Sequence, residues 1–296
     1  MTLANKYRPT EFDQVTEQSV NITILQNQIK DNSYSHALLF AGNAGCGKTT
    51  CARIFANKVN GEIIELDCAS HNGVAEIKDI VEKAKIRSLL YDYKVFILDE
   101  CHTLTPQAWA SLLITLEENI PSTIFIFCTT DTQKIPNTIL SRVQRFNFLP
   151  ISDSGILNRL KTICNEEHIN ISDEALQYIV KSANGNLRQA LTNIDKCLLY
   201  NDLSVDSICK VLNIVSYDIL HNLYDAYINK DRSTIIKLIE LVYNNGYELH
   251  QFVRQFLDYC IDHNSELRII ECLLNIIQDI RYDDSPKNLI IARLII

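Results

Sequence analysis

Three of the eight glycines in this 296-residue chain fall within nine residues, GNAGCGKTT at 42–50. The pattern Gly42-x-x-x-x-Gly47-Lys48-Thr49 follows an apolar run typical of a strand and opens a helical pattern, which is the context that a phosphate-binding loop requires. In such a loop, backbone N–H groups and the positive end of the helix face a β-phosphate, Lys48 reaches the β and γ oxygens, and Thr49 binds Mg²⁺. The alternative is a glycine-rich turn without a ligand. We expect the nucleotide contacts to come from Gly42, Asn43, Ala44, Gly45, Cys46, Gly47, Lys48, Thr49 and Thr50.

Two adjacent acids, Asp99 and Glu100, follow the apolar run VFIL. One carboxylate can hold the shell of a Mg²⁺ ion, and the next can polarise a water for in-line attack on a γ-phosphorus. Adjacent acids at a strand end are often only solvated, but a chain with a phosphate-binding loop has a use for both. We expect their strand to run beside the strand that leads into the loop.

The stretch ILSRVQRFNF, residues 139–148, carries two arginines. Gln144, Phe146 and Phe148 alternate with the residues between them, the pattern of a half-buried strand, and Arg142 lies just before this strand. Taken alone, Arg142 is better explained as an ordinary solvated surface residue than as a catalytic one. Arg145 lies on the strand itself.

Elements that could position these residues follow from the apolar patterns. Short apolar runs predict four buried strands, and helical spacing predicts a helix between each pair. Pro106 is a suitable first residue for the third helix. This alternation predicts a parallel α/β sheet covered by helices on both faces, with ligand sites at the carboxyl ends of its strands. The strands are expected at 36–42, 62–67, 94–100 and 123–130.

From about residue 151, helical patterns replace the strand signals. Two helices are expected around a break at Asn184-Gly185, with Ser172 as the N-cap of the first. Further helices run to the end of the chain. We place domain boundaries near 150 and 202, which gives domains 1–150, 151–202 and 203–296.

Composition limits the function classes. With 47% hydrophobic and 22% charged residues the chain has the make-up of a globular protein, and a net charge of −8 argues against coating nucleic acid through an overall positive field. Lys78 and Lys85 could contact DNA, but they cannot be distinguished from a solvated helix face. The ten cysteines form no C-x-x-C pair, so we expect reduced and mostly buried thiols. Cys101-His102 alone is too small a ligand set for a metal site.

Neither a run of membrane-spanning length nor a secretory signal is present in the sequence. We therefore expect a cytoplasmic protein without membrane contact.

Five segments, in this order and spacing, resemble the AAA+ ATPase subunits of sliding-clamp loaders, in the branch of the bacterial DNA polymerase III gamma/tau subunits. The Cys-His pair after the acids favours this branch over the replication factor C subunits. The resemblance covers nearly the whole chain and implies an AAA+ domain, a helical lid and a helical collar that oligomerises. The segments are NKYRPTEFDQVTEQ, HALLFAGNAGCGKTT, KVFILDECHTLT, TTDTQKIPNTILSRVQRF and NGNLRQAL.

The resemblance implies an ATP-hydrolysing motor subunit that uses Mg²⁺ to load a sliding clamp onto primer-template DNA. Its partners would be other subunits of a hetero-oligomeric, pentameric loader, the clamp and the DNA. Residue roles carried over are the adenine pocket for Tyr7, Arg8 and Pro9, the Mg²⁺ shell for Asp99, the water-activating base for Glu100, the sensors for Thr130 and Arg188, and the arginine finger into a neighbouring subunit for Arg142.

Four departures from the family pattern stand out. Val143 replaces the cysteine of the Ser-Arg-Cys motif, and Glu17 stands where a glycine usually precedes Gln18. The four-cysteine zinc module of gamma/tau subunits is missing between the loop helix and the second strand, so we expect no zinc. The chain also ends soon after its third helical region, which predicts a short, gamma-like subunit, bacterial or phage-encoded.

Two other readings compete with this one. A non-hydrolysing structural subunit would only donate Arg142, but it would not need Lys48, Thr49, Asp99 and Glu100 together. Another AAA+ machine on DNA, such as a branch-migration helicase, would need a winged-helix domain at the C-terminus, where the sequence predicts plain helical packing.

Overall fold

The computed structural model describes residues 1–118, 120–263 and 265–295. These residues form two compact units. The first unit contains residues 1–168 and 183–192, and the second contains residues 169–182 and 193 onward.

The first unit is built around a five-stranded sheet whose neighbouring strands are parallel. All four strands predicted from apolar runs are present to within one residue, and the alternating stretch before residue 149 forms the fifth. The strands lie in the order β2-β3-β4-β1-β5. They are β1 (Ala37–Gly42), β2 (Gly61–Asp67), β3 (Tyr93–Asp99), β4 (Thr123–Thr129) and β5 (Gln144–Phe148).

One expectation about this sheet is wrong. The strand that ends at Asp99 does not run beside the strand that leads into the phosphate loop, because β4 lies between β3 and β1. Every residue of β4 is buried, whereas in β2 only Gly61 is buried and the other positions alternate between partly exposed and exposed. A strand with two covered faces and two paired edges belongs inside the sheet, so β4 separates the two strands.

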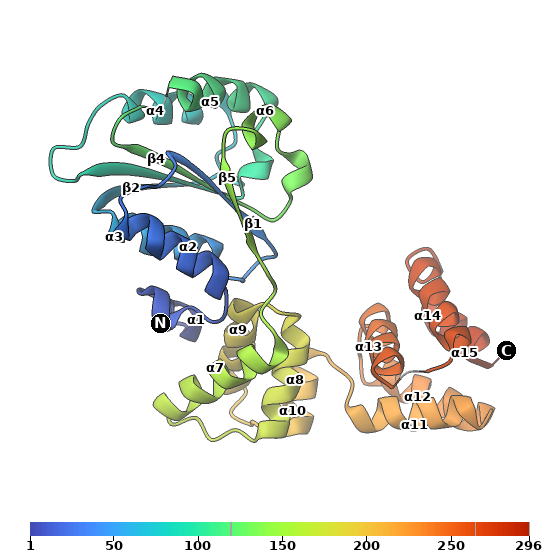
Figure 1. Cartoon of the computed structure of the whole chain (residues 1–296). Helices are drawn as coiled ribbons and strands as arrows, with labels where there is room; N and C mark the ends of the chain where they lie inside the picture. The colour runs from blue at the N-terminus through green and yellow to red at the C-terminus, as the bar shows by residue number, and fades with distance from the viewer. Residues whose placement is uncertain (119, 264, 296) are drawn as a thin grey trace. The chain divides into compact units, whose positions relative to one another are not determined.

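Helices cover both faces of this sheet (Figure 1). On one face, α2 (Ser19–Lys30) and α3 (Lys48–Lys58) pack on Leu38 and Phe40 of β1. On the other face, α4, α5 and α6 pack on Ala37 and Leu39 of the same strand. This alternation of side chains and the two helical layers confirm the predicted α/β fold class. The second-face helices are α4 (Val74–Ala84), α5 (Pro106–Glu118) and α6 (Asn137–Leu140).

The turn before α2 shows how Glu17 occupies a position where a glycine is usual. Both Glu17 and Gln18 adopt left-handed backbone conformations, with φ of 60° and 58°. This conformation is costly for a residue with a side chain, which is a physical reason for a glycine there. Here the Glu17 carboxylate accepts hydrogen bonds from the backbone N–H (3.1 Å) and hydroxyl (2.5 Å) of Ser152, the N-cap of α7 (Asp153–Glu166). A negative charge at the start of a helix offsets part of the backbone cost.

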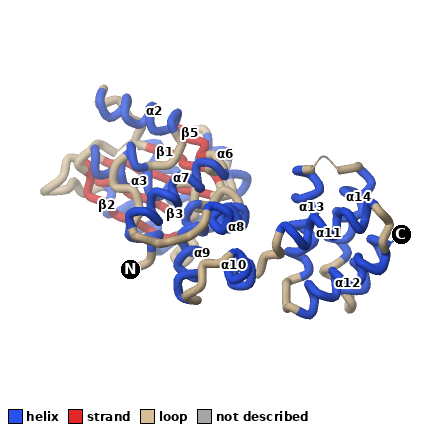
Figure 2. The backbone as a smooth tube through the Cα atoms, turned by 90° about the horizontal axis from the view of Figure 1, so that it is seen from below, coloured by secondary structure: helices blue, strands red, loops and turns tan. Residues whose placement is uncertain are grey.

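After β5, every regular element of the described chain is a helix (Figure 2). Ser172 caps α8 as expected, because its hydroxyl accepts from the N–H of Ala175 at 3.2 Å. Large apolar residues of α11 to α15 form one buried cluster, which includes the predicted faces of Ile235 and Phe252. These helices are α8 (Asp173–Ala183), α9 (Leu187–Leu199), α10 (Val205–Leu212), α11 (Tyr217–Ile228), α12 (Arg232–Asn244), α13 (Leu249–Asp262), α14 (Leu267–Asp279) and α15 (Pro286–Ile295).

All ten cysteines are free thiols, and nine of them are buried, with Cys272 partly exposed. Within the described ranges, no group of three or more His, Cys, Asp or Glu side chains could hold a metal ion. None of the helices that the structure describes has the length and apolar character needed to cross a membrane.

Candidate nucleotide-binding and hydrolysis site

The loop between β1 and α3 depends on its glycines for its shape. Gly45 and Gly47 have φ of 73° and 102°, in the region that side chains disfavour. A Cβ on Gly45 would lie only 1.7 Å from the side-chain oxygen of Asn186, and one on Gly42 would lie 2.1 Å from the carbonyl oxygen of Phe148. Gly42 and Gly45 therefore allow other chain segments to approach closely, and Gly45 and Gly47 supply the backbone turn.

Lys48 begins α3 and points back into this loop. Its side chain is only 5% exposed, and its Nζ donates to the carbonyl oxygens of Gly42 (2.9 Å) and Asn43 (2.8 Å). These carbonyls satisfy a buried ammonium that has no carboxylate partner among the described residues. The loop therefore holds a positive charge on its inner side, as a site for an anion requires.

Thr49 and Asp99 join the start of α3 to the end of β3. The Thr49 hydroxyl donates to the Asp99 carboxylate at 2.8 Å, although β4 lies between β3 and β1, the strand that leads to α3. A hydroxyl and a carboxylate in contact, beside a phosphate loop, match the oxygen donors with which Mg²⁺ is held together with phosphates. The residues present therefore fit the expected ion.

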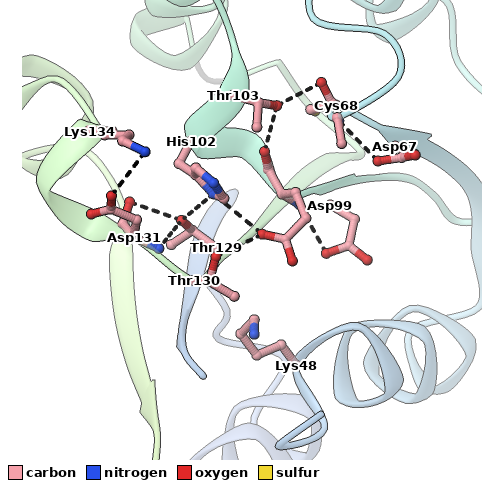
Figure 3. Close-up of polar contacts among 12 residues, drawn as sticks. Lys48, Asp67, Cys68, Asp99, His102, Thr103, Thr129, Thr130, Asp131 and Lys134 are labelled. Atoms are coloured by element: carbon pink, nitrogen blue, oxygen red, sulfur yellow. Dashed lines mark hydrogen bonds and ion pairs between the residues drawn. The ribbon is translucent and has the colours of Figure 1, made fainter. Parts of the chain in front are cut away.

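Glu100 follows Asp99 in a left-handed backbone conformation, with φ of 48° and ψ of 41°. Its carboxylate Oε2 accepts from the Thr130 hydroxyl at 3.1 Å and lies 3.3 Å from Nδ1 of His102. Figure 3 shows His102, Thr129 and Thr130 gathered near Asp99 at the carboxyl ends of β3 and β4. A non-glycine residue in this conformation is strained, and such strain is found at functional sites. The sequence does not predict that His102 and Thr129 lie beside Glu100, because it does not show which side chains a short turn brings together.

The N-terminal segment lies against the loop. Arg8 Nε donates to the Thr50 hydroxyl at 3.3 Å, and burial lowers the pKa of its guanidinium. The Tyr7 hydroxyl donates to Glu167, and this hydrogen bond raises the pKa of the phenol. Lys6 pairs with the same carboxylate at 2.6 Å. The segment is thus tied at one end to α3 and at the other to the end of α7.

One cavity of the first unit joins these parts. The predicted residues Tyr7, Arg8, Pro9, Arg188, Asp99 and Glu100 line it, together with Ala44 to Thr50 of the loop. Sequence reasoning missed several of its apolar walls, whose burial comes only with the folded chain. These are Val15, Ile151, Leu187 and Leu191.

Two of the predicted catalytic residues, Thr130 and Arg142, are not among the residues that line this cavity, but Thr130 contacts Glu100, which does line it, whereas Arg142 lies apart. Its guanidinium pairs with Glu117 of α5 at 2.5 Å and donates to the carbonyl oxygen of Thr138 at 2.7 Å. Arg145 is exposed and donates to the carbonyl oxygen of Leu140 at 3.2 Å. These contacts in the first unit do not bring Arg142 to the cavity where the chain's own nucleotide is expected.

A phosphate loop, an acid pair at a strand end and a helical segment with an arginine define a nucleotide-hydrolysing α/β class. A family model described as "ATPase family associated with various cellular activities (AAA)" matches residues 38–151. A second, described as "RCF1/5-like, AAA+ ATPase lid domain", matches residues 158–194. The chain therefore belongs to the AAA+ ATPases and carries a lid domain of the clamp-loader type.

Within that class, the chain is similar to subunits of DNA polymerase III. It is 35% identical over 277 residues to DNA polymerase III subunit gamma/tau of Mycoplasma genitalium, covering 84% of this chain and 46% of that protein. It is 33% identical to DNA polymerase III subunit tau of Bacillus subtilis, covering 86% of this chain and 50% of that protein. The resemblance expected from the motifs is confirmed. The chain spans about half the length of these relatives.

Solved structures add support for the fold alone. The RuvB Holliday junction branch migration motor of Thermotoga maritima superposes with a TM-score of 0.59 at 19% identity, over 75% of this chain and 80% of that one. At this identity the likeness carries no information on the reaction or the partners.

Proposed function

We propose that this chain is an ATP-hydrolysing motor subunit of a clamp loader, which couples ATP binding and hydrolysis to loading of a sliding clamp onto primer-template DNA. The observation that carries the proposal is the placement of Glu100. It lies beside the Thr49–Asp99 pair, in contact with Thr130, at the carboxyl edge of the sheet. A subunit that only braces an assembly has no need for a strained, oriented base at this point.

In this proposal the residues of the loop divide the work of binding. Lys48 and the loop's N–H groups bind the β- and γ-phosphates, and Tyr7, Arg8 and Pro9 contact the adenine side. Thr49 and Asp99 would hold Mg²⁺, which supplies charge neutralisation on the phosphate oxygens. The ammonium of Lys48 exchanges its carbonyl partners for phosphate oxygens when a nucleotide binds, so its buried charge stays compensated.

Hydrolysis is assigned to Glu100 and its neighbours. Glu100 accepts a proton from the attacking water as the water oxygen bonds to the γ-phosphorus. The bond between this phosphorus and the β–γ bridging oxygen breaks, so that the products are ADP and phosphate. Thr130 holds the carboxylate through its hydroxyl, and Arg188 on α9 reaches the γ-phosphate from the lid side. Lid closure would then depend on ATP rather than ADP.

Arg142 is assigned to a neighbouring subunit's nucleotide. Its guanidinium lies just after α6, about one-third exposed, and Arg142 is not among the described residues that line the cavity. An arginine supplied by another subunit stabilises transition-state charge only in the assembly. The chain alone should therefore hydrolyse ATP slowly.

We also assign the domains and partners on this basis. Residues 1–150 form the ATPase domain, 151–202 the lid and 203–296 a collar that oligomerises with the other loader subunits, in the cytoplasm. The cluster of apolar residues in α11 to α15 supports an independently packed collar.

One experiment tests the proposal. ATPase activity is measured for the chain alone, then with candidate partner subunits, then with the sliding clamp and primed DNA added. Strong stimulation by clamp plus primed DNA is expected, and a Glu100→Gln variant, with a strongly lowered rate, serves as the matched control. The proposal is wrong if no ATP is hydrolysed under any of these conditions. A hydrolysis rate that does not change when clamp and DNA are added would favour another AAA+ machine.

A further inference from the structure

The contacts around Glu100 single out a residue with no role so far. His102 follows Glu100 by two residues, in the 3₁₀ turn Cys101–Thr103 after β3. Its side chain is 15% exposed, and Nδ1 lies 3.3 Å from the Glu100 carboxylate. The same nitrogen lies 3.3 Å from the hydroxyl of Thr129, a fully buried residue at the end of β4.

The hydrogen bonds of Thr129 determine which atom carries the imidazole proton. The Thr129 hydroxyl donates to the carbonyl oxygen of Asp131 at 3.1 Å and accepts from the N–H of Asp131 at 3.0 Å. Its single proton is therefore used, and it can only accept from the ring of His102. Because a carboxylate is also an acceptor, Nδ1 faces two acceptors and must carry the proton.

Backbone contacts fix the turn that places this ring. Glu100 is left-handed, and its carbonyl oxygen accepts from the N–H of Thr103 at 3.0 Å. The Thr103 hydroxyl lies 2.7 Å from the carbonyl oxygen of Cys68 and 2.9 Å from that of Glu100. The turn is thus tied to the end of β2, which limits the movement of His102 relative to Glu100.

We infer that His102 is a positioning residue for ATP hydrolysis. Its Nδ1–H and the Thr130 hydroxyl together hold Oε2 of Glu100, so that Oε1, which receives no hydrogen bond from the described residues, is left to take the proton of the attacking water. Thr129 holds the ring from behind. This inference rests on the proposed role of Glu100 as the base.

Two substitutions of His102 separate this role from a purely structural one. In asparagine, the side-chain nitrogen stands where Nδ1 stands in histidine, whereas in glutamine it stands closer to the place of Nε2. We expect His102→Ala to lower kcat of the assembled complex about tenfold or more, since a polar contact with the charged Glu100 carboxylate is removed. The ATP Kd of the full chain should change less than about twofold. His102→Asn should restore most of the rate and His102→Gln should not.

A second background tests whether the effect runs through Glu100. In the Glu100→Gln variant, His102→Ala should cause no further loss of rate, because residues that act as a unit are not additive. Melting temperatures identify any variant that fails to fold. If His102→Ala is such a variant, the rates of the Asn and Gln variants can still be compared with each other.

The outcomes distinguish the inference from the proposed function. If the wild-type assembly hydrolyses ATP and Glu100→Gln leaves only a small residual rate, but His102→Ala keeps the wild-type kcat, the inference is wrong. It is also wrong if glutamine restores the rate as well as asparagine, or if the loss is the same without Glu100. If the wild-type assembly does not hydrolyse ATP at all, the proposed function itself has failed.

Discussion

Replacement of Arg142 by alanine should have almost no effect on folding and a large effect on catalysis in a neighbouring subunit. In the folded chain, the guanidinium makes an ion pair with Glu117 in which the two side chains are 35% and 50% exposed. Pairs this exposed contribute about 0.2–1 kcal/mol to the free energy of unfolding. An arginine finger, in contrast, accelerates phosphoryl transfer by about 10³–10⁵, or roughly 4–7 kcal/mol of barrier. The two magnitudes differ enough to separate a structural residue from a catalytic one.

The assay mixes two differently tagged copies of the chain with the other loader subunits. One copy carries Arg142→Ala and keeps its nucleotide site, and the other carries Lys48→Ala and keeps its arginine. Each variant alone should give an assembly with little hydrolysis. Mixed assemblies should regain activity wherever an intact arginine faces an intact nucleotide site. Arg145→Ala is the matched control, since that arginine is also exposed and, within the described part of the chain, donates to a backbone carbonyl alone.

Glu117 provides a second control within the same pair. Glu117→Gln removes the charge that holds the guanidinium in the free chain, but leaves Arg142 and its bond to Thr138 in place. The neighbour's rate should then change by about fivefold at most, the worth of an exposed pair. The reasoning is refuted if Arg142→Ala abolishes ATP binding by its own chain, if mixing restores nothing, or if Arg145→Ala causes the same loss.

Three further predictions concern the loop, a helix cap and the thiols. Gly45→Ala should weaken ATP binding about tenfold or more, because φ is 73° and the new Cβ would lie 1.7 Å from the Asn186 oxygen; titration with a fluorescent ATP analogue that finds wild-type affinity would contradict this. The carboxylate of Asp231, the N-cap of α12, has its pKa lowered to about 2 by the hydrogen bond from the Thr234 hydroxyl. A lowered pKa stabilises the fold above the unfolded value near 3.8, and this stabilisation is lost as the pH falls through about 2. The melting-temperature difference between wild type and Asp231→Asn should therefore shrink between about pH 5 and pH 2, and a constant difference would argue against it. Burial raises the pKa of Cys51 to about 12, so at pH 8 iodoacetamide should label it only after denaturation, as mass spectrometry can check.

The phosphate loop and the strands were predictable because both depend on local sequence. A loop of this kind needs glycines at fixed spacing between a strand and a helix, and buried parallel strands are continuous apolar runs. The order of the strands was not predictable in the same way. The residues of β4 alone do not predict that it lies between β3 and β1. The position of one strand depends on how all five strands pack between the two helical layers.

Contacts between side chains that are distant in sequence also escaped prediction. Asn186 packs against Gly45 across more than a hundred residues, and Glu17 binds Ser152 over a similar separation. Glu17 shows the limit most clearly. Its left-handed backbone conformation is unfavourable for a residue with a side chain. The position tolerates glutamate because the carboxylate binds at the start of α7, a contact that the local sequence does not show.

Under the proposed function, the contacts of Glu100 and Arg142 explain why hydrolysis should depend on assembly. Glu100 is held by Thr130 and His102 of its own unit, so the base is already oriented before any partner binds. Arg142 is held as well, but by Glu117 and away from the cavity that its own chain supplies. An exposed ion pair of this kind is weak enough to be exchanged for a phosphate in a neighbouring subunit at little cost. The chain therefore supplies an oriented base, Glu100, for its own nucleotide and an arginine, Arg142, for the nucleotide of a neighbour. A second subunit is needed to bring a base and an arginine to the same nucleotide.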